Sequence, residues 1–516
     1  MTLGETLSGV RLKQPLPAEL AGIEIEGLEY DSRRVGRNFL FFAFPGSHAD
    51  GRQYVQDAWT RGAVAVASES EAPGTGGGLL FTAPWIQVEH GRQALAIASR
   101  NFYGKPDERL YLTAITGTNG KTTTSYLIDS VFRAAGHITA LVGTIEYHLA
   151  GRVLPAVNTT PESLDLVRLL RDLELAGGTH MTMEVSSHAL ALGRVYGLHI
   201  HTAVFTNLTR DHLDFHKTMD AYFAAKQSLF EGAGGPPPPF AVLNRDDPYA
   251  RRLKLDPTTE ALWYGLGQDP DLRARHISTG FDGLRFDVQH GKKRFAVESP
   301  LIGKINVYNI LAACGTALTY GMAPEVIARG IAQLRSVPGR FERVDEGQPF
   351  VVVVDYAHTD DALRNVISVA RGLNPKRVIT LFGCGGDRDR TKRPLMGQAA
   401  AEASDFVVLT SDNPRSEDPL AIMNDALVGI RRKDVPHVVE PDRATAIARA
   451  LKEAREGDIV ILAGKGHEPY QVLKDKTIPF DDRQVAREVL RGYGYGKGPG
   501  TGRGTAKGSG PASSGT

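Results

Sequence analysis

The stretch TGTNGKTTT at residues 116–124 lies between a predicted strand and a predicted helix. LYLTAI (110–115) alternates and is β-prone, whereas SYLIDSVFRAAG (125–136) carries apolar residues at helical spacing and ends on glycine. A glycine-rich turn at such a junction lets backbone N–H groups converge on phosphate oxygens, and the helix N-terminus adds its partial positive charge. We therefore expect this stretch to bind the phosphates of a nucleotide.

Two side chains of this loop suit nucleotide chemistry. Lys121 would reach the β and γ phosphates, and the Thr122 hydroxyl would bind Mg²⁺. The general P-loop pattern is not met, because it requires glycine where this chain has Ile115. The alternative interpretation is a threonine-rich turn that leads into a core helix without any ligand. The flanking strand and helix favour phosphate binding.

The composition is that of an ordinary globular protein. A chain of 516 residues predicts about three domains. Sixty basic and 59 acidic residues leave a net charge of +1, so no electrostatic signature of nucleic-acid binding is present. The sequence shows neither a signal-peptide pattern nor a long apolar run, and its two cysteines are too few for a disulfide framework. We expect a cytoplasmic enzyme without a membrane span.

Strands and helices alternate along most of the chain, which predicts an α/β fold. Residues 1–104 mix short strands and helices, and residues 105–336 alternate apolar strands with helices, which favours a buried parallel sheet. Residues 337–491 predict a second open, mostly parallel sheet, in which ligands gather at the carboxyl ends of the strands. The tail 492–516 is rich in glycine and serine, and we expect it to be disordered.

Polar residues in the middle of the chain suit a metal site. Glu184 follows the predicted strand HMTMEVSS (180–187), where a carboxylate beside a P-loop is a natural Mg²⁺ ligand. His212 lies in the dense polar loop TNLTRDHLDFH (206–216), and Lys226 lies in a predicted amphipathic helix. Taken singly, these residues are equally typical of a solvated strand end, a surface loop and a lysine whose ammonium reaches water.

Polar clusters also follow four apolar strands in the last third of the chain. They are DYAHTDDAL (355–363), GCGGDRDRTKRP (383–394), DNPRSEDP (412–419) and GKGHEPYQ (464–471). Each is also typical of a simple turn. Together they predict a cleft lined with arginines, suited to bidentate capture of carboxylates or phosphates. A carboxylate-bearing substrate beside an ATP site is the inference from these residues alone.

These motifs, in this order, resemble the Mur ligase family, and in particular the branch that adds the third residue of the peptidoglycan stem peptide. The resemblance extends from YDSRR (30–34) through TGTNGKTTT, EVSSH, TNLTRDHLD, GRFE, DYAHT and DNPR to GKGHE (464–468). It implies a UDP-binding domain over 1–104, an ATP-binding P-loop domain over 105–336 and a Rossmann-like amino-acid-binding domain over 337–491. It also implies a reaction in which ATP phosphorylates the terminal carboxylate of UDP-MurNAc-L-Ala-D-Glu, and an amino acid's amine then attacks the acyl phosphate.

The resemblance assigns roles residue by residue around the nucleotide. ATP binding is implied for Gly117, Thr118, Asn119, Gly120, Lys121, Thr122, Thr123, Asn309, Arg340, Asp355 and His358. Mg²⁺ binding is implied for Thr122, Glu184, His212 and Lys226, with Lys226 carbamylated. Lys121, Glu184, His212 and Lys226 are the expected catalytic residues. Carbamylation turns an ammonium into an anion, which explains a lysine near a metal.

The resemblance also assigns the two other substrates. UDP-MurNAc-L-Ala-D-Glu is expected to contact Tyr30, Ser32, Ser47, His48, Ala49, Asn158, Thr159, Thr160, Ser186 and Arg194. At position 192 the chain has leucine where some relatives carry glutamine, so that contact is not carried over. The amino acid is expected to contact Arg388, Asp412, Asn413, Pro414, Arg415, Gly464 and Glu468.

The motif DNPR favours meso-diaminopimelate as the added amino acid, because Arg415 would pair with its distal carboxylate. Ornithine and lysine remain the alternatives within this branch. A folylpolyglutamate synthetase-like ligase is a more distant alternative, and a P-loop switch or motor that only hydrolyses nucleotide is another. We expect the enzyme to be a monomer.

Overall fold

The computed structural model describes residues 1–46, 50–72, 84–267 and 269–496. It divides into two compact units, Met1–Pro338 and Gly339–Thr516. Most of the predicted tail lies outside the described residues, which end at 496; helix α16 ends at Gly492.

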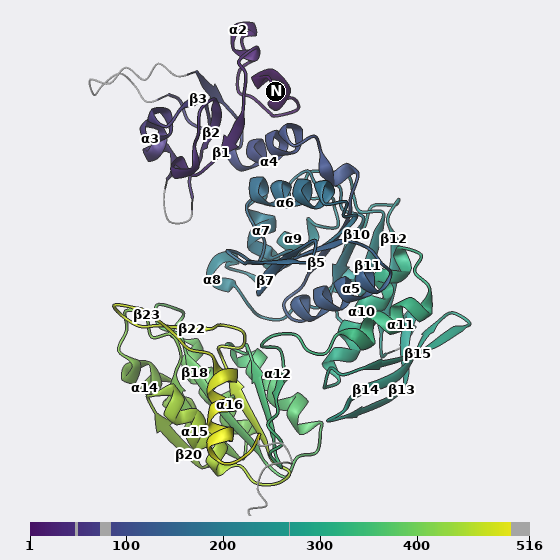
Figure 1. The fold of residues 1–516 in the computed structure, drawn as a ribbon, viewed down its shortest axis with the longest axis vertical. Helices are drawn as coiled ribbons and strands as arrows, with labels where there is room; N and C mark the ends of the chain where they lie inside the picture. The colour runs from purple at the N-terminus through teal and green to yellow at the C-terminus, as the bar shows by residue number, and fades with distance from the viewer. Residues whose placement is uncertain (47–49, 73–83, 268, 497–516) are drawn as a thin grey trace, which may run out of the picture. The chain divides into compact units, whose positions relative to one another are not determined.

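The first unit begins with a small parallel sheet. Its strands, in spatial order, are β1 (Gly27–Glu29), β2 (Phe39–Ala43), β3 (Ala63–Ser68) and β4 (Trp85–Gln87). Helix α4 (Gly91–Phe102) packs on one face and helix α3 (Val55–Thr60) on the other, each over its own apolar cluster. The short helices α1 (Leu3–Thr6) and α2 (Ala18–Ala21) precede this sheet (Figure 1).

An eleven-stranded mixed sheet forms the centre of the first unit, in the order β15-β14-β13-β12-β11-β10-β5-β9-β6-β7-β8. The strands are β5 (Tyr111–Thr116), β6 (Thr139–Val142), β7 (Glu146–Leu149), β8 (Arg152–Pro155), β9 (His180–Glu184), β10 (Thr202–Phe205), β11 (Phe240–Asn244), β12 (Glu260–Gly265), β13 (Leu272–Gly280), β14 (Gly283–His290) and β15 (Lys293–Ser299). Strands β6, β9, β5, β10, β11, β12 and β13 pair in parallel, so the loops after β5, β9 and β10 meet at one edge.

Helices cover both faces of this sheet (Figure 1). One face carries α5 (Lys121–Ala134), α10 (Ile305–Thr319) and α11 (Pro324–Gln333). The other carries α6 (Ser163–Leu175), α7 (Ser187–Ala191) and α9 (Met219–Gln227), with the short α8 (Leu213–His216) nearby. The central strands are therefore buried on both sides, which explains their continuous apolar sequences.

The two ends of the central sheet differ from the predicted parallel arrangement. Strands β13, β14 and β15 pair antiparallel at one end, and β6, β7 and β8 do so at the other. Buried residues alternate with more exposed ones along β14. A strand with one solvated face is compatible with antiparallel pairing, and its sequence lacks the continuous apolar run of a central strand.

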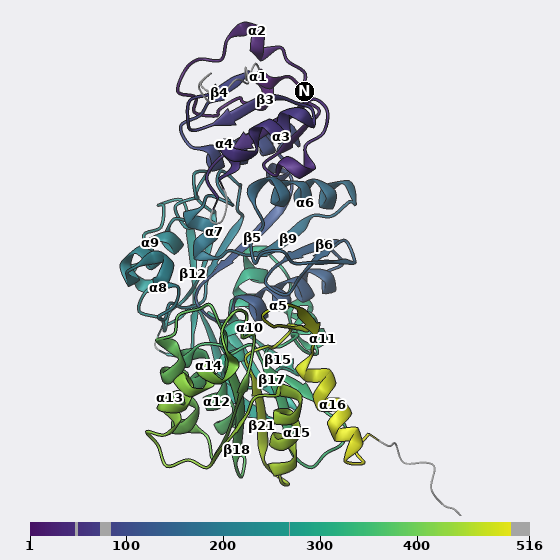
Figure 2. The same cartoon turned by 90° about the vertical axis from the view of Figure 1, so that its left-hand side faces the viewer.

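The second unit is a six-stranded sheet in the order β16-β17-β21-β18-β19-β20, parallel except for β16. The strands are β16 (Glu342–Val344), β17 (Val351–Asp355), β18 (Val378–Cys384), β19 (Phe406–Ser411), β20 (His437–Glu440) and β21 (Ile459–Ala463), with a small hairpin of β22 (Tyr470–Val472) and β23 (Thr477–Pro479). Helices α12 (Asp360–Arg371), α13 (Lys392–Ala403) and α14 (Pro419–Ile430) cover one face, and α15 (Arg443–Glu453) and α16 (Asp482–Gly492) the other (Figure 2). The predicted α/β class with a Rossmann-like second sheet is confirmed.

An aromatic cluster closes the amino end of the central sheet, opposite the loops described above. His180 is buried there, and its ring centroid lies 4.0 Å from that of His137 and 4.6 Å from that of Phe132. Burial, followed by the neighbouring His137 and His201, lowers the pKa of His180 to about 4. The folded protein therefore favours the neutral ring.

Acid should destabilise the first unit through His180. The unfolded chain takes up this proton near its ordinary pKa of about 6.5, so the stabilisation is complete above that pH and declines as the pH falls toward about 4. When the pH is lowered from 7.5 to 5, we expect the urea concentration at the midpoint of unfolding to fall less for His180→Phe than for wild type. His276→Asn, at an exposed histidine of the same unit, is the control. Equal losses in wild type and His180→Phe would refute the assignment.

No helix among the described residues is long and apolar enough to cross a membrane.

Candidate active site

The predicted phosphate loop joins β5 to α5 as a tight turn at the carboxyl edge of the central sheet. Gly117 and Gly120 have φ angles of 147° and 87°, which favour glycine. A Cβ atom at Gly117 would lie 1.9 Å from Thr206 Oγ1, so the approach of β10 also requires glycine there. Lys121 Nζ donates to the carbonyl oxygens of Gly117 and Thr118, both at 2.9 Å. The loop is thus a glycine-dependent turn at the N-terminus of a helix, as expected for a phosphate-binding loop.

Glu184 lies beside this loop, as expected from its place at the end of β9. Its carboxylate is buried and accepts hydrogen bonds from Thr122 Oγ1 at 3.0 Å, from the Thr144 backbone N–H at 2.9 Å and from Thr144 Oγ1 at 3.1 Å. The two residues predicted to share Mg²⁺, Thr122 and Glu184, are therefore in direct contact. A hydroxyl and a carboxylate are the oxygen donors that Mg²⁺ prefers.

Lys226 is buried rather than solvated, although it lies on a short surface helix. It is 1% exposed, and its Nζ donates to the Gly117 carbonyl oxygen at 2.9 Å and to Thr116 Oγ1 at 3.4 Å. Nζ also lies 4.7 Å from the centroid of the Tyr222 ring. Burial, followed by the charge of Lys121, holds the pKa of Lys226 well below its usual value. Burial therefore favours the neutral amine, which is the nucleophilic form.

His212 directly precedes α8, in a left-handed backbone conformation with φ of 52°. Its side chain is 44% exposed, and its Nε2 lies 3.4 Å from Asp211 Oδ2. Partial burial lowers the pKa of His212, and the charges of Lys121 and Lys226 act in the same direction. The neutral ring is the form that ligates metals.

The residues predicted to position the UDP-linked substrate gather around the same sheet edge. Thr160 Oγ1 donates to the Glu184 carbonyl oxygen at 2.9 Å and accepts from the Ser186 N–H at 3.1 Å. Arg194 Nη1 donates to the Thr160 carbonyl oxygen at 2.9 Å. Thr159 contacts Thr144, and the Asn158 carbonyl accepts from Tyr147. This group of predicted residues is therefore contiguous with the phosphate loop through Glu184.

Asn309, predicted to contact ATP, reaches the loop from α10. A Cβ atom at Gly120 would lie 2.5 Å from Asn309 Oδ1, and Thr124 Oγ1 lies 3.4 Å from the same oxygen.

The predicted uridine contacts lie partly outside the described residues, because Ser47, His48 and Ala49 are not among them. Tyr30 follows β1, and its hydroxyl donates to Asp165 on α6 at 2.5 Å. Ser32 is buried in the turn after it. Tyr30 therefore joins the small sheet to the central one.

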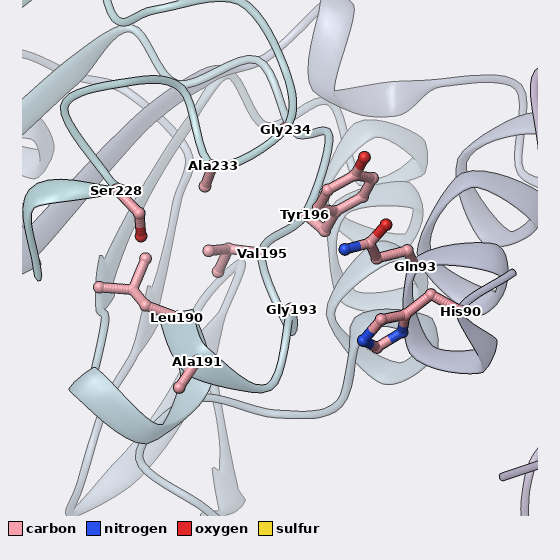
Figure 3. A pocket seen from close by; sticks show the side chains of 10 residues that line it. All are labelled: His90, Gln93, Leu190, Ala191, Gly193, Val195, Tyr196, Ser228, Ala233 and Gly234. Atoms are coloured by element: carbon pink, nitrogen blue, oxygen red, sulfur yellow. The ribbon is translucent and has the colours of Figure 1, made fainter. Parts of the chain in front are cut away.

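A cavity of about 230 Å³ lies between α4 and the loop after α7 (Figure 3). His90 and Gln93 line it from the side of α4, facing Gly193 and Tyr196, and Leu190, Ala191 and Val195 add apolar surface. None of the predicted site residues that the structure describes lines this cavity, although two of its lining residues, Gly193 and Val195, flank Arg194 in the chain.

In the second unit, the predicted nucleotide contacts lie just before β16 and at the end of β17. Asp355 accepts hydrogen bonds from the backbone N–H groups of Phe341 at 2.7 Å and Ala357 at 2.9 Å. The Arg340 guanidinium lies 5.0 Å from the centroid of the Tyr356 ring. His358 is exposed, and its Nδ1 lies 2.9 Å from the Tyr356 carbonyl oxygen.

The predicted amino-acid pocket is formed by the loops after β18, β19 and β21. Arg415 Nη1 donates to the Gly386 carbonyl oxygen at 2.7 Å, and a Cβ atom at Gly385 would meet both Arg415 and Arg388. Asn413 Nδ2 donates to Glu468 Oε2 at 3.0 Å. Gly464 has a φ of 115° and lies against the Asp412 carboxylate, while Pro414 is buried beside Gly386. Three strand ends thus bring all seven predicted residues to one place.

The prediction of a cleft lined by several arginines is only partly correct. Arg393 is buried and pairs with Glu417 at 2.7 Å and Asp425 at 2.9 Å, and Arg390 pairs with Asp425 at 3.1 Å. These guanidinium groups bind the protein's own carboxylates. Arg388 and Arg415 are the ones that remain beside Gly385.

Comparison with known proteins places the chain in a family. Three family models match it: the Mur ligase family catalytic domain over residues 24–103, the Mur ligase middle domain over 115–317, and the Mur ligase glutamate ligase domain over 339–466. A protein of Solibacter usitatus named UDP-N-acetylmuramoyl-L-alanyl-D-glutamate--2,6-diaminopimelate ligase is 76% identical over 495 residues, 96% of this chain and 99% of that protein. The chain belongs to the Mur ligase family. The resemblance inferred from the motifs is therefore confirmed.

Solved structures agree with this Mur ligase assignment. A structure titled UDP-N-acetylmuramoyl-L-alanyl-D-glutamate--2,6-diaminopimelate ligase has a TM-score of 0.68 and 33% identity, and the match covers 96% of this chain and 99% of that one. The MurF ligase of Thermotoga maritima, solved in complex with ADP, has a TM-score of 0.59 over 90% of this chain and 96% of that one. At 17% identity, this second likeness concerns the fold alone.

Two residues that contact the candidate site, Thr144 and Glu162, are not part of the motifs. Thr144 donates hydrogen bonds to Glu184 from both its backbone N–H and its hydroxyl. Its position, two residues after the end of β6 at the same sheet edge, is the feature of the sequence that could have indicated this contact. Glu162 is buried between Arg92, with Nη1 to Oε2 at 2.5 Å, and Arg194, with Nε to Oε1 at 3.6 Å. No sequence pattern indicated that pairing, because Arg92 lies 70 residues away.

Proposed function

We propose that this Mur ligase is an ATP-dependent amide ligase that adds meso-diaminopimelate to UDP-MurNAc-L-Ala-D-Glu. One observation carries the proposal: the 76% identity to a ligase of that name extends over 96% of the chain, and so over both units. The contact of Thr122 with Glu184 beside the phosphate loop supports ATP use. ATP and UDP-MurNAc-L-Ala-D-Glu are substrates expected in the cytoplasm, so we propose that the enzyme acts there. We also expect it to be a monomer.

The reaction needs an activated carboxylate, because a free carboxylate is a poor electrophile. The terminal phosphoryl group of ATP is transferred to a carboxylate oxygen, and ADP leaves. The amine then attacks the carbonyl carbon, the C–N bond forms, the C–O bond to phosphate breaks, and the amine loses its proton. Lys121 would turn from the loop carbonyls toward the phosphate oxygens and offset their charge.

The metal ligands proposed for this step fit the donors present. Thr122 and Glu184 would hold one Mg²⁺, and His212 with carbamylated Lys226 would hold a second. When bound, the ions would neutralise charge on the phosphates. Asn309, Arg340, Asp355 and His358 would contact the nucleotide, and the residues around Thr160 and Arg194 would orient the UDP-linked substrate.

The pocket of the second unit would select the amino acid. Arg415 offers a planar pair of donors to the distal carboxylate of meso-diaminopimelate. Lysine and ornithine lack that carboxylate and would leave their terminal ammonium near a guanidinium of like charge. We further propose that residues 1–104, 105–336 and 337–491 bind the UDP moiety, ATP and the amino acid, respectively.

Phosphate release tests the function directly. We expect release only when ATP, UDP-MurNAc-L-Ala-D-Glu and an amino acid are all present, with meso-diaminopimelate used at least about tenfold more efficiently than L-lysine or L-ornithine. The measurement is kcat/KM for each amino acid at saturating concentrations of the other two substrates. Release without an amino acid would contradict ligation and favour a nucleotide hydrolase. Faster turnover of L-lysine would contradict the specificity.

A further inference from the structure

Lys465 is a buried cation at the floor of the amino-acid pocket, and motif comparison gives it no role. It follows Gly464 in the loop after β21, and its side chain is 0% exposed. Its Nζ lies 3.0 Å from Asn413 Oδ1, 3.3 Å from Asp412 Oδ1 and 3.5 Å from Glu468 Oε2. All three partners are predicted to bind the amino acid.

The contacts of these partners form one connected network. Asn413 donates from Nδ2 to Glu468, while its Oδ1 accepts from both Lys465 and the Val472 N–H at 2.9 Å. Gln471 Nε2 donates to the Asp412 carbonyl oxygen at 2.6 Å. Lys465 therefore holds two carboxylates and one amide in defined positions, and its charge offsets the mutual repulsion of the carboxylates.

The charges of the pocket suggest why the cation is needed. Asp412 and Glu468 contribute two negative charges, and Lys465 and Arg415 contribute two positive ones, so these four groups sum to zero. Arg388 is exposed, and water and salt screen its charge. A neutral pocket suits a group that carries one ammonium and one carboxylate. A bare ammonium fits better in a pocket with net negative charge.

We propose that Lys465 is a positioning residue that sets amino-acid specificity: by offsetting one carboxylate of the pocket, it favours a substrate whose far end carries both an ammonium and a carboxylate over one that ends in an ammonium alone. This inference rests on the proposed function. Lys465 acts through Asp412, Asn413 and Glu468.

Two substitutions separate charge from packing. Lys465→Gln keeps hydrogen-bond donors for the carboxylates and removes the charge, whereas Lys465→Arg keeps the charge. Lys474→Gln, at an exposed lysine of the same unit, is the matched control. For each protein we would measure kcat and KM for meso-diaminopimelate and for L-lysine, KM for ATP and for UDP-MurNAc-L-Ala-D-Glu, and Tm.

In Lys465→Gln we expect KM for meso-diaminopimelate to rise about tenfold, and the kcat/KM preference over L-lysine to fall at least about tenfold. KM for ATP and for the UDP-linked substrate should stay within about twofold of wild type. A general destabilisation of the fold would change KM for all three substrates and not for meso-diaminopimelate alone. Lys465→Arg and Lys474→Gln should keep the preference within about threefold of wild type. An unchanged preference in Lys465→Gln would overturn the proposal.

If Lys465→Gln shows no cooperative melting, the result for Lys465→Arg tests the proposal instead. A retained kcat/KM preference for meso-diaminopimelate over L-lysine supports the proposal, and a tenfold loss of that preference overturns it. Failure of the proposed function would be visible separately, because wild-type enzyme would then not use meso-diaminopimelate.

Discussion

Lys226→Ala is expected to lose ligase activity by about 100-fold or more. The amine of Lys226 is buried against the phosphate loop, and burial lowers its pKa and so favours the neutral form, which is the form that adds CO₂. The N–C bond forms, one proton is released, and a carbamate anion results. Removing the side chain removes this anion from the proposed metal site beside Glu184 and His212.

The experiment compares kcat for wild type, Lys226→Ala and Lys226→Arg, with Lys254→Ala at an exposed lysine of the same unit as control. Lys226→Arg places a permanent cation at this position and cannot form the carbamate, so it should be as inactive as the alanine variant. A carbamate carbon signal should appear by NMR in wild type supplied with ¹³C-bicarbonate and be missing in both variants. Wild-type activity in Lys226→Ala would refute the role.

Removing one partner of the buried Arg443–Asp482 pair is expected to destabilise the second unit by about 3–5 kcal/mol. Both side chains are 0% exposed, with Nη2 to Oδ2 at 2.6 Å and Nε to Oδ1 at 2.8 Å. Arg443 also donates to the carbonyl oxygens of Ala463 at 3.0 Å and Ser411 at 3.3 Å. Arg443→Met would leave a carboxylate buried without its partner.

Urea unfolding of the full chain measures this effect, with the transition of the second unit followed separately where the two units melt apart. Arg443→Met with Asp482→Leu should recover much of the loss, because an apolar pair leaves no buried charge. Arg364→Met breaks a more exposed ion pair with Glu402 and should cost less than about 1 kcal/mol. An equally small effect of Arg443→Met would contradict the assignment.

Much of the candidate site could be predicted because parallel strands end at a common edge. The polar segments after β5, β9 and β10, and those after β18, β19 and β21, are separated in sequence but meet for this reason. The contact of Thr122 with Glu184 was predictable in this way. The antiparallel ends of the central sheet were not, because half-solvated strands such as β14 lack a continuous apolar run.

The sequence by itself determined the α/β class, the phosphate loop at 116–124 and the family, because local patterns and ordered motifs carry that information. Only the tertiary structure decided which long charged side chains are buried. Arg393 pairs with Glu417 and Asp425 and does not line the pocket. Lys226 and Lys465 are buried at the proposed sites. The burial and the charge partners of such a side chain depend on segments distant in sequence, and its own neighbours in the chain do not specify them.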